Sequence, residues 1–236
     1  MSEWAAKRFW KTTATTAAVD GFGIELDGRP VKTPAKAPLI VPTAALASAI
    51  AAEWDAQQDK IDPLTMPVTR GANAAIDKVA TQKSEVVALL AAYGDSDLLC
   101  YRAAGPAALI AEQKMNWDPL LDWADETYGV RLRSGEGVMH VAQDADGLAR
   151  LTAELDLLSP FELAAAHDLI SLSGSLIIGL AVMRGYVAAP RAWAVSRVDE
   201  EWQISQWGED EEARAQEMLK SQAFENAACF FEMCQN

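Results

Sequence analysis

The residues of this sequence best suited to covalent chemistry are three cysteines and two histidines: Cys100, Cys229, Cys234, His140 and His167. A cysteine hydrolase needs a thiol that a histidine base can activate, and Cys100 with His140 or His167 could supply one. Neither histidine has a second histidine or a cysteine at the spacing of a zinc site. The pattern favours structural roles for both, and a cysteine hydrolase remains an alternative.

Other signatures of catalysis fail. The glycines at 21, 23 and 28 are spaced wrongly for a dinucleotide fingerprint, and no GxxxxGK[ST] phosphate loop occurs. Asp144 to Gly147 resembles the start of a calcium loop, but Leu155 stands where the bidentate glutamate should be. We therefore predict no catalytic residues, no metal and no cofactor, and a binding protein rather than an enzyme.

An acidic and aromatic segment, residues 199–208, is the most distinctive feature. On a helical wheel Glu200 shares a face with four residues, which are Trp193, Arg197, Ile204 and Trp207. Glu201 follows Arg197 by four positions and can pair with it. Glu200 either lies at a helix edge and pairs with Arg197, or faces a partner from within an aromatic ring, as interface anchors do. These six residues form the candidate partner-binding set.

The amino-acid composition limits the classes of partner that the protein can bind. The 236 residues include 20 Lys and Arg against 34 Asp and Glu, a net charge of −14. Such a surface repels nucleic acid and anionic lipid headgroups and attracts basic protein surfaces. The most apolar window, residues 169–183, is shorter than the roughly 20 residues that span a bilayer, so we expect no membrane insertion. The odd number of cysteines and the lack of a signal peptide indicate an intracellular protein.

The N-terminal part of the chain has the pattern of a small sheet. Phe22, Ile24 and Leu26 alternate with polar residues or glycine, and Asp27-Gly28 predicts a tight turn into a return strand over residues 29–33. Beyond Val41 the period changes. A helical stripe follows, in which Leu46, Ile50 and Trp54 recur at four-residue spacing, and we assign these three residues a structural role.

Nearly everything after residue 69 has helical periodicity. We expect the helix to kink or restart at Asp118-Pro119, one buried helix from Pro160 to about Gly185, and a last helical stretch broken only at Gly208. The predicted fold class is α+β. A small N-terminal β domain with the first helix as connector (1–68) is followed by a larger, mainly helical domain (69–236).

Several runs along the chain carry a resemblance to a known family. They are residues 8–11 (RFWK), 26–34 (LDGRPVKTP), 41–43 (VPT), 52–57 (AEWDAQ), 97–102 (DLLCYR), 117–120 (WDPL) and 200–208. Together they span nearly the whole chain. In these runs the chain resembles the assembly chaperones of the F-type ATP synthase that act on the α subunit of its catalytic head, found in mitochondria and alphaproteobacteria.

This resemblance implies a two-domain chaperone that binds the unassembled α subunit, prevents its aggregation and is displaced on assembly with the β subunit. It also implies an important acidic residue in the helical domain, for which Glu200 and Glu201 both qualify. The chain begins without the N-terminal extension of the mitochondrial members, so we expect a bacterial cytoplasmic protein, monomeric when free. The alternative is a general holdase without a fixed client. Holdases favour methionine-rich surfaces, whereas the seven methionines here are scattered.

Overall fold

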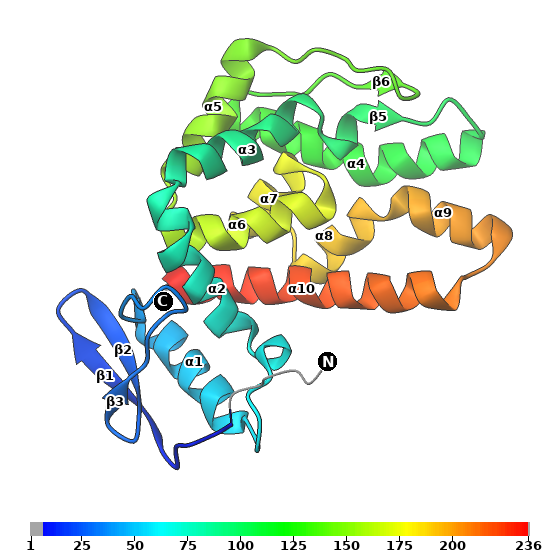
Figure 1. The fold of residues 1–236 in the computed structure, drawn as a ribbon. Helices are drawn as coiled ribbons and strands as arrows, with labels where there is room; N and C mark the ends of the chain where they lie inside the picture. The colour runs from blue at the N-terminus through cyan, green and yellow to red at the C-terminus, as the bar shows by residue number, and fades with distance from the viewer. Residues whose placement is uncertain (1–6, 236) are drawn as a thin grey trace. The chain divides into compact units, whose positions relative to one another are not determined.

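The structure, a computed structural model, describes residues 7–235 and packs as two compact units (Figure 1). The first, here called the sheet unit, comprises the chain up to Lys83, Ser159–Ala165 and the chain from Cys229 onward. The second, the helical unit, comprises Ser84–Leu158 and Ala166–Ala228. Strands near the N-terminus followed by a mostly helical body confirm the predicted α+β class. The domain boundary at residues 68 and 69 stays a prediction.

The sheet unit is built around one central strand. The strands are β1 (Thr13–Ala18), β2 (Gly21–Leu26), β3 (Arg29–Pro30) and β4 (Ile40–Val41). All three neighbours pair antiparallel with β2. At the predicted turn Asp27 has φ 50° and Gly28 φ 75°, the backbone that an Asp-Gly hairpin turn requires. The predicted hairpin is therefore present, but its return strand covers only Arg29–Pro30 and not residues 29–33.

Helix α1 (Ala44–Ala56) packs against β1 and β2. It begins at Thr43, whose Oγ1 accepts a hydrogen bond from the backbone N–H of Leu46 at 3.2 Å. Leu46 and Ile50 are fully buried, and the half-buried Trp54 meets the ring of Trp10 at a centroid distance of 5.2 Å. Three further elements complete this part of the chain, which are η1 (Pro63–Thr65), α2 (Pro67–Asp77) and η2 (Val79–Thr81).

The helical unit packs around the long helix α4. The remaining elements in chain order are α3 (Lys83–Asp95), η3 (Leu98–Cys100), β5 (Tyr101–Arg102), α4 (Ala107–Tyr128), β6 (Gly135–Glu136), α5 (Ala145–Asp156), α6 (Pro160–Ser173), α7 (Leu176–Met183), α8 (Ala189–Ser196), α9 (Val198–Trp207) and α10 (Glu211–Gln235). The part of α6 up to Ala165 and the part of α10 from Cys229 belong to the sheet unit. Trp117 of α4 is fully buried, and its Nε1 donates to the Val195 carbonyl at 2.9 Å. Among residues 7–235, none of the helices combines the length and apolar character that crossing a membrane requires.

The restart that was one alternative at Asp118-Pro119 and the single helix predicted from Pro160 to Gly185 are both wrong. The chain does not restart at Pro119, because α4 continues through it; the buried Trp117, Leu120 and Leu121 hold that face in place despite the missing hydrogen bond. The predicted helix from Pro160 to Gly185 is two helices. Gly174 adopts φ 70°, outside the helical region, and the side chain of Ser175 caps the N-terminus of α7.

Candidate functional site

The acidic and aromatic segment forms α9, and it is separated from α8 by a single residue. Arg197 has φ −109° and ψ 13°, so the helix that ends at Ser196 does not run directly into the one that begins at Val198. Gly208 is thus not the only break in this stretch, as the sequence had indicated. One consequence is that the helical wheel from residue 193 to residue 207 does not describe a continuous face.

A stack of four side chains supports the start of α9. Nη1 of Arg197 lies 2.9 Å from Oε1 of Glu200, and the guanidinium lies 5.6 Å from the centroid of the Trp193 ring. Trp193 is only 6% exposed and packs on Phe224 at a centroid distance of 5.6 Å. Trp193 therefore has little surface for direct contact with a partner and serves as a support for Arg197.

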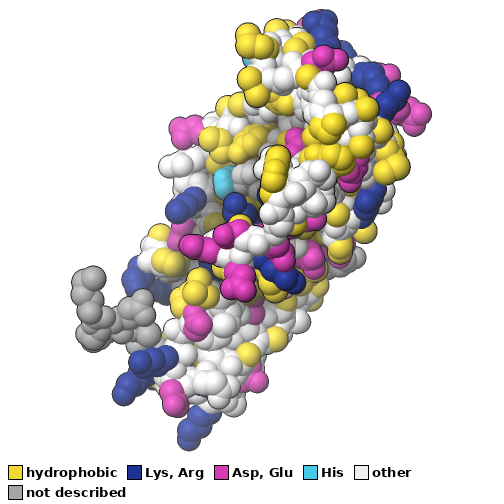
Figure 2. All heavy atoms as spheres, turned by 90° about the vertical axis from the view of Figure 1, so that its right-hand side faces the viewer, with side chains coloured by type: hydrophobic (Ala, Val, Ile, Leu, Met, Phe, Trp, Pro, Cys, Tyr) yellow, Lys and Arg dark blue, Asp and Glu magenta, His cyan; other side chains and the backbone are white. Residues whose placement is uncertain are grey.

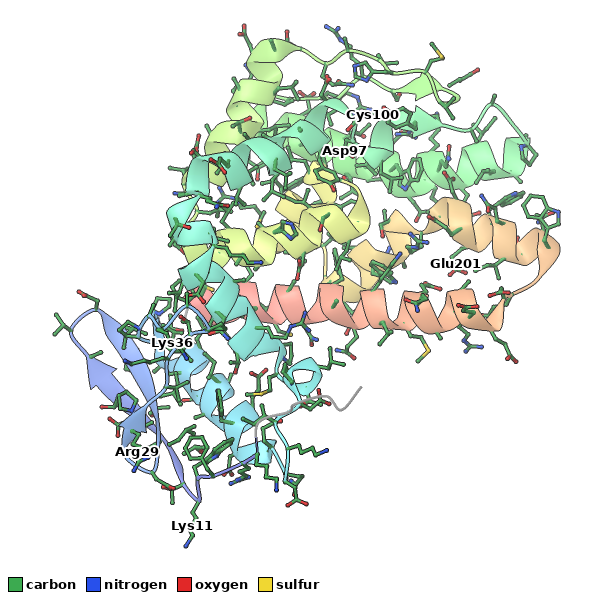
Figure 3. All side chains as sticks on the ribbon, in the orientation of Figure 1. Lys11, Arg29, Lys36, Asp97, Cys100 and Glu201 are labelled. Carbon is green, nitrogen blue, oxygen red and sulfur yellow. The ribbon has the colours of Figure 1, made fainter. Side chains whose placement is uncertain are left out.

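Glu201 lies outside this stack. Its backbone N–H donates to the Arg197 carbonyl at 2.8 Å, while its side chain is exposed (Figure 3). Arg197 pairs with Glu200, three positions along, and no ion pair with Glu201 occurs among the described residues. Of the two candidate carboxylates, Glu200 is thus engaged within the chain and Glu201 is directed to solvent.

The far end of α9 carries exposed apolar surface. Ile204 is half-buried, and Trp207 is 79% exposed. Gly208 ends the helix with φ 88°, and its N–H donates to the Ile204 carbonyl at 2.8 Å. Tryptophan is on average one of the more buried residue types, so Trp207 is a candidate contact for a ligand or partner.

Negative charge is concentrated in the same part of the chain. The helical unit holds 10 basic and 23 acidic residues, a net charge of −13, whereas the sheet unit holds 10 and 11, a net charge of −1. Residues 198–217 alone contain 8 acidic residues and 1 basic residue. Figure 2 views the molecule from the side on which α9 lies in Figure 1, and it shows acidic side chains next to hydrophobic ones. Such a surface attracts a basic partner.

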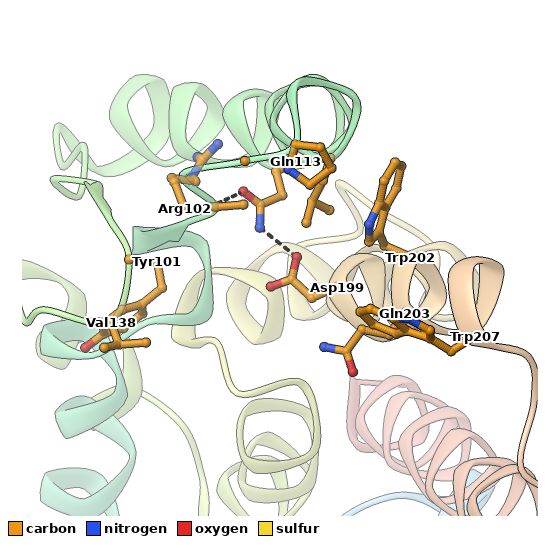
Figure 4. A pocket seen from close by; sticks show the side chains of 13 residues that line it. Tyr101, Arg102, Gln113, Val138, Asp199, Trp202, Gln203 and Trp207 are labelled. Atoms are coloured by element: carbon orange, nitrogen blue, oxygen red, sulfur yellow. Dashed lines mark hydrogen bonds between the residues drawn. The ribbon is translucent and has the colours of Figure 1, made fainter.

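A pocket of about 350 Å³ borders α9 (Figure 4). Asp199, Trp202 and Trp207 of α9 line it, together with Gln113 of α4. The sequence did not single out Asp199 or Gln113. One signal was present, since Ile110, Gln113 and Trp117 recur at helical spacing and place a polar residue on the apolar face of α4.

The side chains that could do covalent chemistry are not assembled for it. Cys100 is 5% exposed, and burial raises the pKa of its thiol to about 12. His140 lies 3.3 Å from Asp95 and His167 lies 2.9 Å from Asp168. Within residues 7–235 no hydrogen bond joins either histidine to Cys100. The neutral thiol is a poor nucleophile, so the arrangement does not favour a cysteine hydrolase.

Metal ligands are not clustered either. Across the described range no group of three or more His, Cys, Asp or Glu side chains is placed to hold a metal ion. The arrangement around α9 is instead one of charged and aromatic side chains, which suits reversible binding of a protein surface.

A protein family, a mitochondrial protein and two solved structures that this chain resembles all carry the name ATP12. A family described as ATP12 chaperone protein matches residues 7–125. The mitochondrial protein atp12 of Schizosaccharomyces pombe is 31% identical over 219 residues, which are 88% of this chain and 75% of that protein. The crystal structure of Atp12 from Paracoccus denitrificans aligns with a TM-score of 0.95 and 50% identity, over 98% of this chain and 100% of that one. An Asp-to-Lys mutant of Atp12p from the same organism aligns with a TM-score of 0.95 and 49% identity, over 99% and 100% of the two chains.

Proposed function

The chain belongs to the ATP12 chaperone family, and we propose that it binds the unassembled α subunit of the F-type ATP synthase catalytic head. It keeps this client soluble until the β subunit takes its place. The proposal includes a monomer when free and action in the bacterial cytoplasm. Neither binding nor release requires nucleotide hydrolysis by this chain, since its sequence contains no phosphate loop.

The observation that carries the proposal is Trp207, 79% exposed on the acidic helix α9. An exposed tryptophan surrounded by charge is a poor surface for a protein that works alone and a good anchor for one that works in a complex. Aromatic anchors supply contact area at low cost in conformational entropy, and neighbouring carboxylates favour a basic partner.

The six candidate residues divide into two roles in this proposal. Glu201, Ile204 and Trp207 have the exposure needed to touch the client. Glu200 and Arg197 form the ion pair that orients the first turn of α9, and Trp193 supports that pair from the interior. The first group determines the affinity for the client. The second group determines the orientation in which α9 presents the first group to the client.

A chaperone for a subunit interface has to meet two physical requirements. The unassembled subunit exposes apolar surface that would aggregate, so that surface must be covered. The chaperone must also dissociate when the β subunit binds. A small apolar anchor within a charged rim meets both requirements, because exposed charge pairs speed encounter and add little to the lifetime of a complex.

The first test is co-purification. The tagged protein is incubated with an extract that contains ATP synthase subunits, and the captured proteins are identified by mass spectrometry. We expect the α subunit to be the dominant partner, and light scattering should show that the purified protein suppresses α-subunit aggregation at about equimolar concentration. Capture of the β subunit alone, or of no ATP synthase subunit, contradicts the proposal. Size-exclusion chromatography coupled to light scattering measures the molar mass of the free protein and tests whether it is a monomer.

One observation favours a second candidate, the general holdase. Met115 on α4, Met139 after β6 and Met218 on α10 are 69%, 76% and 65% exposed, and flexible exposed methionines suit promiscuous binding. They lie on three separate elements, which favours a minor role. Equal suppression of aggregation for the α subunit and for an unrelated heat-denatured protein would select the holdase.

A further inference from the structure

The pocket beside α9 contains a carboxylate whose position is fixed. Oε1 of Gln113 accepts a hydrogen bond from the backbone N–H of Ala103 at 2.8 Å, and its Nε2 donates to Oδ1 of Asp199 at 2.6 Å (Figure 4). Gln113 is 1% exposed. The hydrogen bond to Ala103 sets which end of the amide is which, so the NH₂ group must face Asp199. One oxygen of the Asp199 carboxylate is therefore positioned by this hydrogen bond before any ligand arrives.

The charge of this carboxylate is not neutralised within the pocket. The one cation in the lining is Arg102, and it is already engaged. Its guanidinium lies 2.9 Å from Asp118 and 5.3 Å from the centroid of the Trp117 ring, and its Nε donates to the Leu99 carbonyl at 2.8 Å. Among the described residues no ion pair reaches Asp199. The pocket thus carries one uncompensated negative charge.

Aromatic surface lies next to that charge. Trp202 and Trp207 line the pocket from α9, and Tyr101 lines it from β5 (Figure 4). Indole rings attract cations through their negative faces, most strongly when the cation is the planar guanidinium of arginine, which also stacks. A fixed carboxylate beside two indoles is a complementary environment for a guanidinium and a poor one for an anion.

We infer that this pocket receives an arginine side chain of the client, which pairs with Asp199 and stacks on Trp202 or Trp207. The inference rests on the proposed function for the identity of the client, and it adds the chemistry that selects the client segment. Residues next to that arginine would be apolar, since Leu109 and Val138 complete the wall and Val138 is 91% exposed. The net charge of −13 on the helical unit favours approach of such a basic segment.

The test uses two fluorescein-labelled peptides. Each has a single central residue flanked by leucines and alanines, and this residue is arginine in one peptide and citrulline in the other. Citrulline keeps the shape and removes the charge. Fluorescence anisotropy should give an affinity for the arginine peptide at least about tenfold higher than for the citrulline peptide, as expected for a charge-assisted contact with an aromatic face.

Asp199→Asn is the decisive variant, because the asparagine oxygen can still accept from Gln113 while the charge is lost. It should abolish the preference for arginine. Asp125→Asn, an exposed position on α4 with the same loss of charge, is the matched control and should keep it. Trp202→Leu should weaken both peptides. Circular dichroism verifies that each variant is folded. No preference in the parent, no measurable binding of either peptide, or an unchanged preference in Asp199→Asn overturns the inference.

Capture of the α subunit by the same proteins separates this inference from the proposed function. If the parent captures the α subunit but shows no arginine preference, the pocket assignment fails and the proposed function stands. If the parent prefers the arginine peptide but does not capture the α subunit, the pocket assignment stands for another basic client and the proposed function fails.

Discussion

Oδ2 of Asp97 accepts a hydrogen bond from the backbone N–H of Ile177 at 3.1 Å, although the two residues are 80 positions apart. Oδ1 of the same carboxylate accepts from the N–H of Leu99 at 3.0 Å. One fully buried side chain therefore caps both η3 and the first turn of α7, and it joins two segments of the helical unit (Figure 3). Cys100 follows in the same short helix, so this junction also explains why its thiol is buried.

The Asp97 junction predicts a specific pH dependence of stability. Burial raises the pKa of this carboxyl from 3.8 to about 6, so the folded state binds the proton more tightly than the unfolded state. Its contribution to the free energy of unfolding is therefore present below about pH 4 and is lost as the pH rises to about 6, by roughly 3 kcal/mol. Urea titrations from pH 4 to pH 7 measure this. Asp97→Asn should show a flatter profile over that window, and a profile parallel to that of the parent would contradict the assignment.

Glu53 predicts a stability effect at a distance from its own helix. Its carboxylate accepts from the N–H groups of Val68 and Thr69, both at 2.7 Å, and from the Thr69 hydroxyl at 2.6 Å. It thus caps the N-terminus of α2, where Met66 provides no side-chain cap. Glu53→Ala should lower the free energy of unfolding by about 1.5–3 kcal/mol, because these donors lose a charged acceptor. Asp20→Ala, at an exposed turn, is the control. If Glu53→Ala and Asp20→Ala have the same free energy of unfolding, the Glu53 cap does not contribute to stability.

Trp54 is predicted to be structural. It packs edge-on against Trp10, which is 3% exposed, at the end of the stripe formed by Leu46 and Ile50. Trp54→Ala should lower the free energy of unfolding by about 3 kcal/mol. Trp54→Arg should lower it further, because it places a charge against apolar surface. Trp54→Phe keeps a ring at this contact and should cost much less. Thermal melts measure all three. Normal melting of Trp54→Ala with loss of client binding would move this residue to the interface.

The cysteines predict an order of labelling. Burial raises the pKa of both Cys100 and Cys234 to about 12, whereas Cys229 is exposed. Iodoacetamide at pH 8 reacts with thiolates, so it should modify Cys229 first and Cys100 only after unfolding. Peptide mass spectrometry of native and urea-treated protein gives the rates. Rapid labelling of Cys100 in the native protein would contradict this order and would support the alternative that the chain is a cysteine hydrolase.

The features that the sequence predicted correctly are those that depend on near neighbours. The hairpin at Asp27-Gly28 follows from a strand of alternating apolar residues and a turn whose dipeptide favours positive φ. The start of α1 follows from Thr43, whose side chain caps a helix three residues later. In both cases the interaction that decides the structure lies within a few positions.

The features that it could not predict depend on distant neighbours or on a single backbone angle. Glu53 lies off the apolar stripe of α1 and resembles a solvated residue until α2 lies against it. Asp199 and Gln113 meet across 86 positions. Arg197 is a good helix former, so its type gives no sign of the non-helical backbone that separates α8 from α9.

We propose that α9 presents Glu201 to the client. The most direct measurement is the affinity of the α subunit for the parent, Glu201→Lys and Glu200→Lys, with Asp125→Lys as a charge-matched control on α4. Glu201→Lys should melt like the parent and bind at least about thirtyfold more weakly, as expected when one partner of a desolvated charge pair is reversed. Glu200→Lys loses a partly exposed pair with Arg197, worth about 0.3–0.5 kcal/mol of stability. If Glu201→Lys binds the α subunit as tightly as Asp125→Lys does, α9 is not the surface that holds the client.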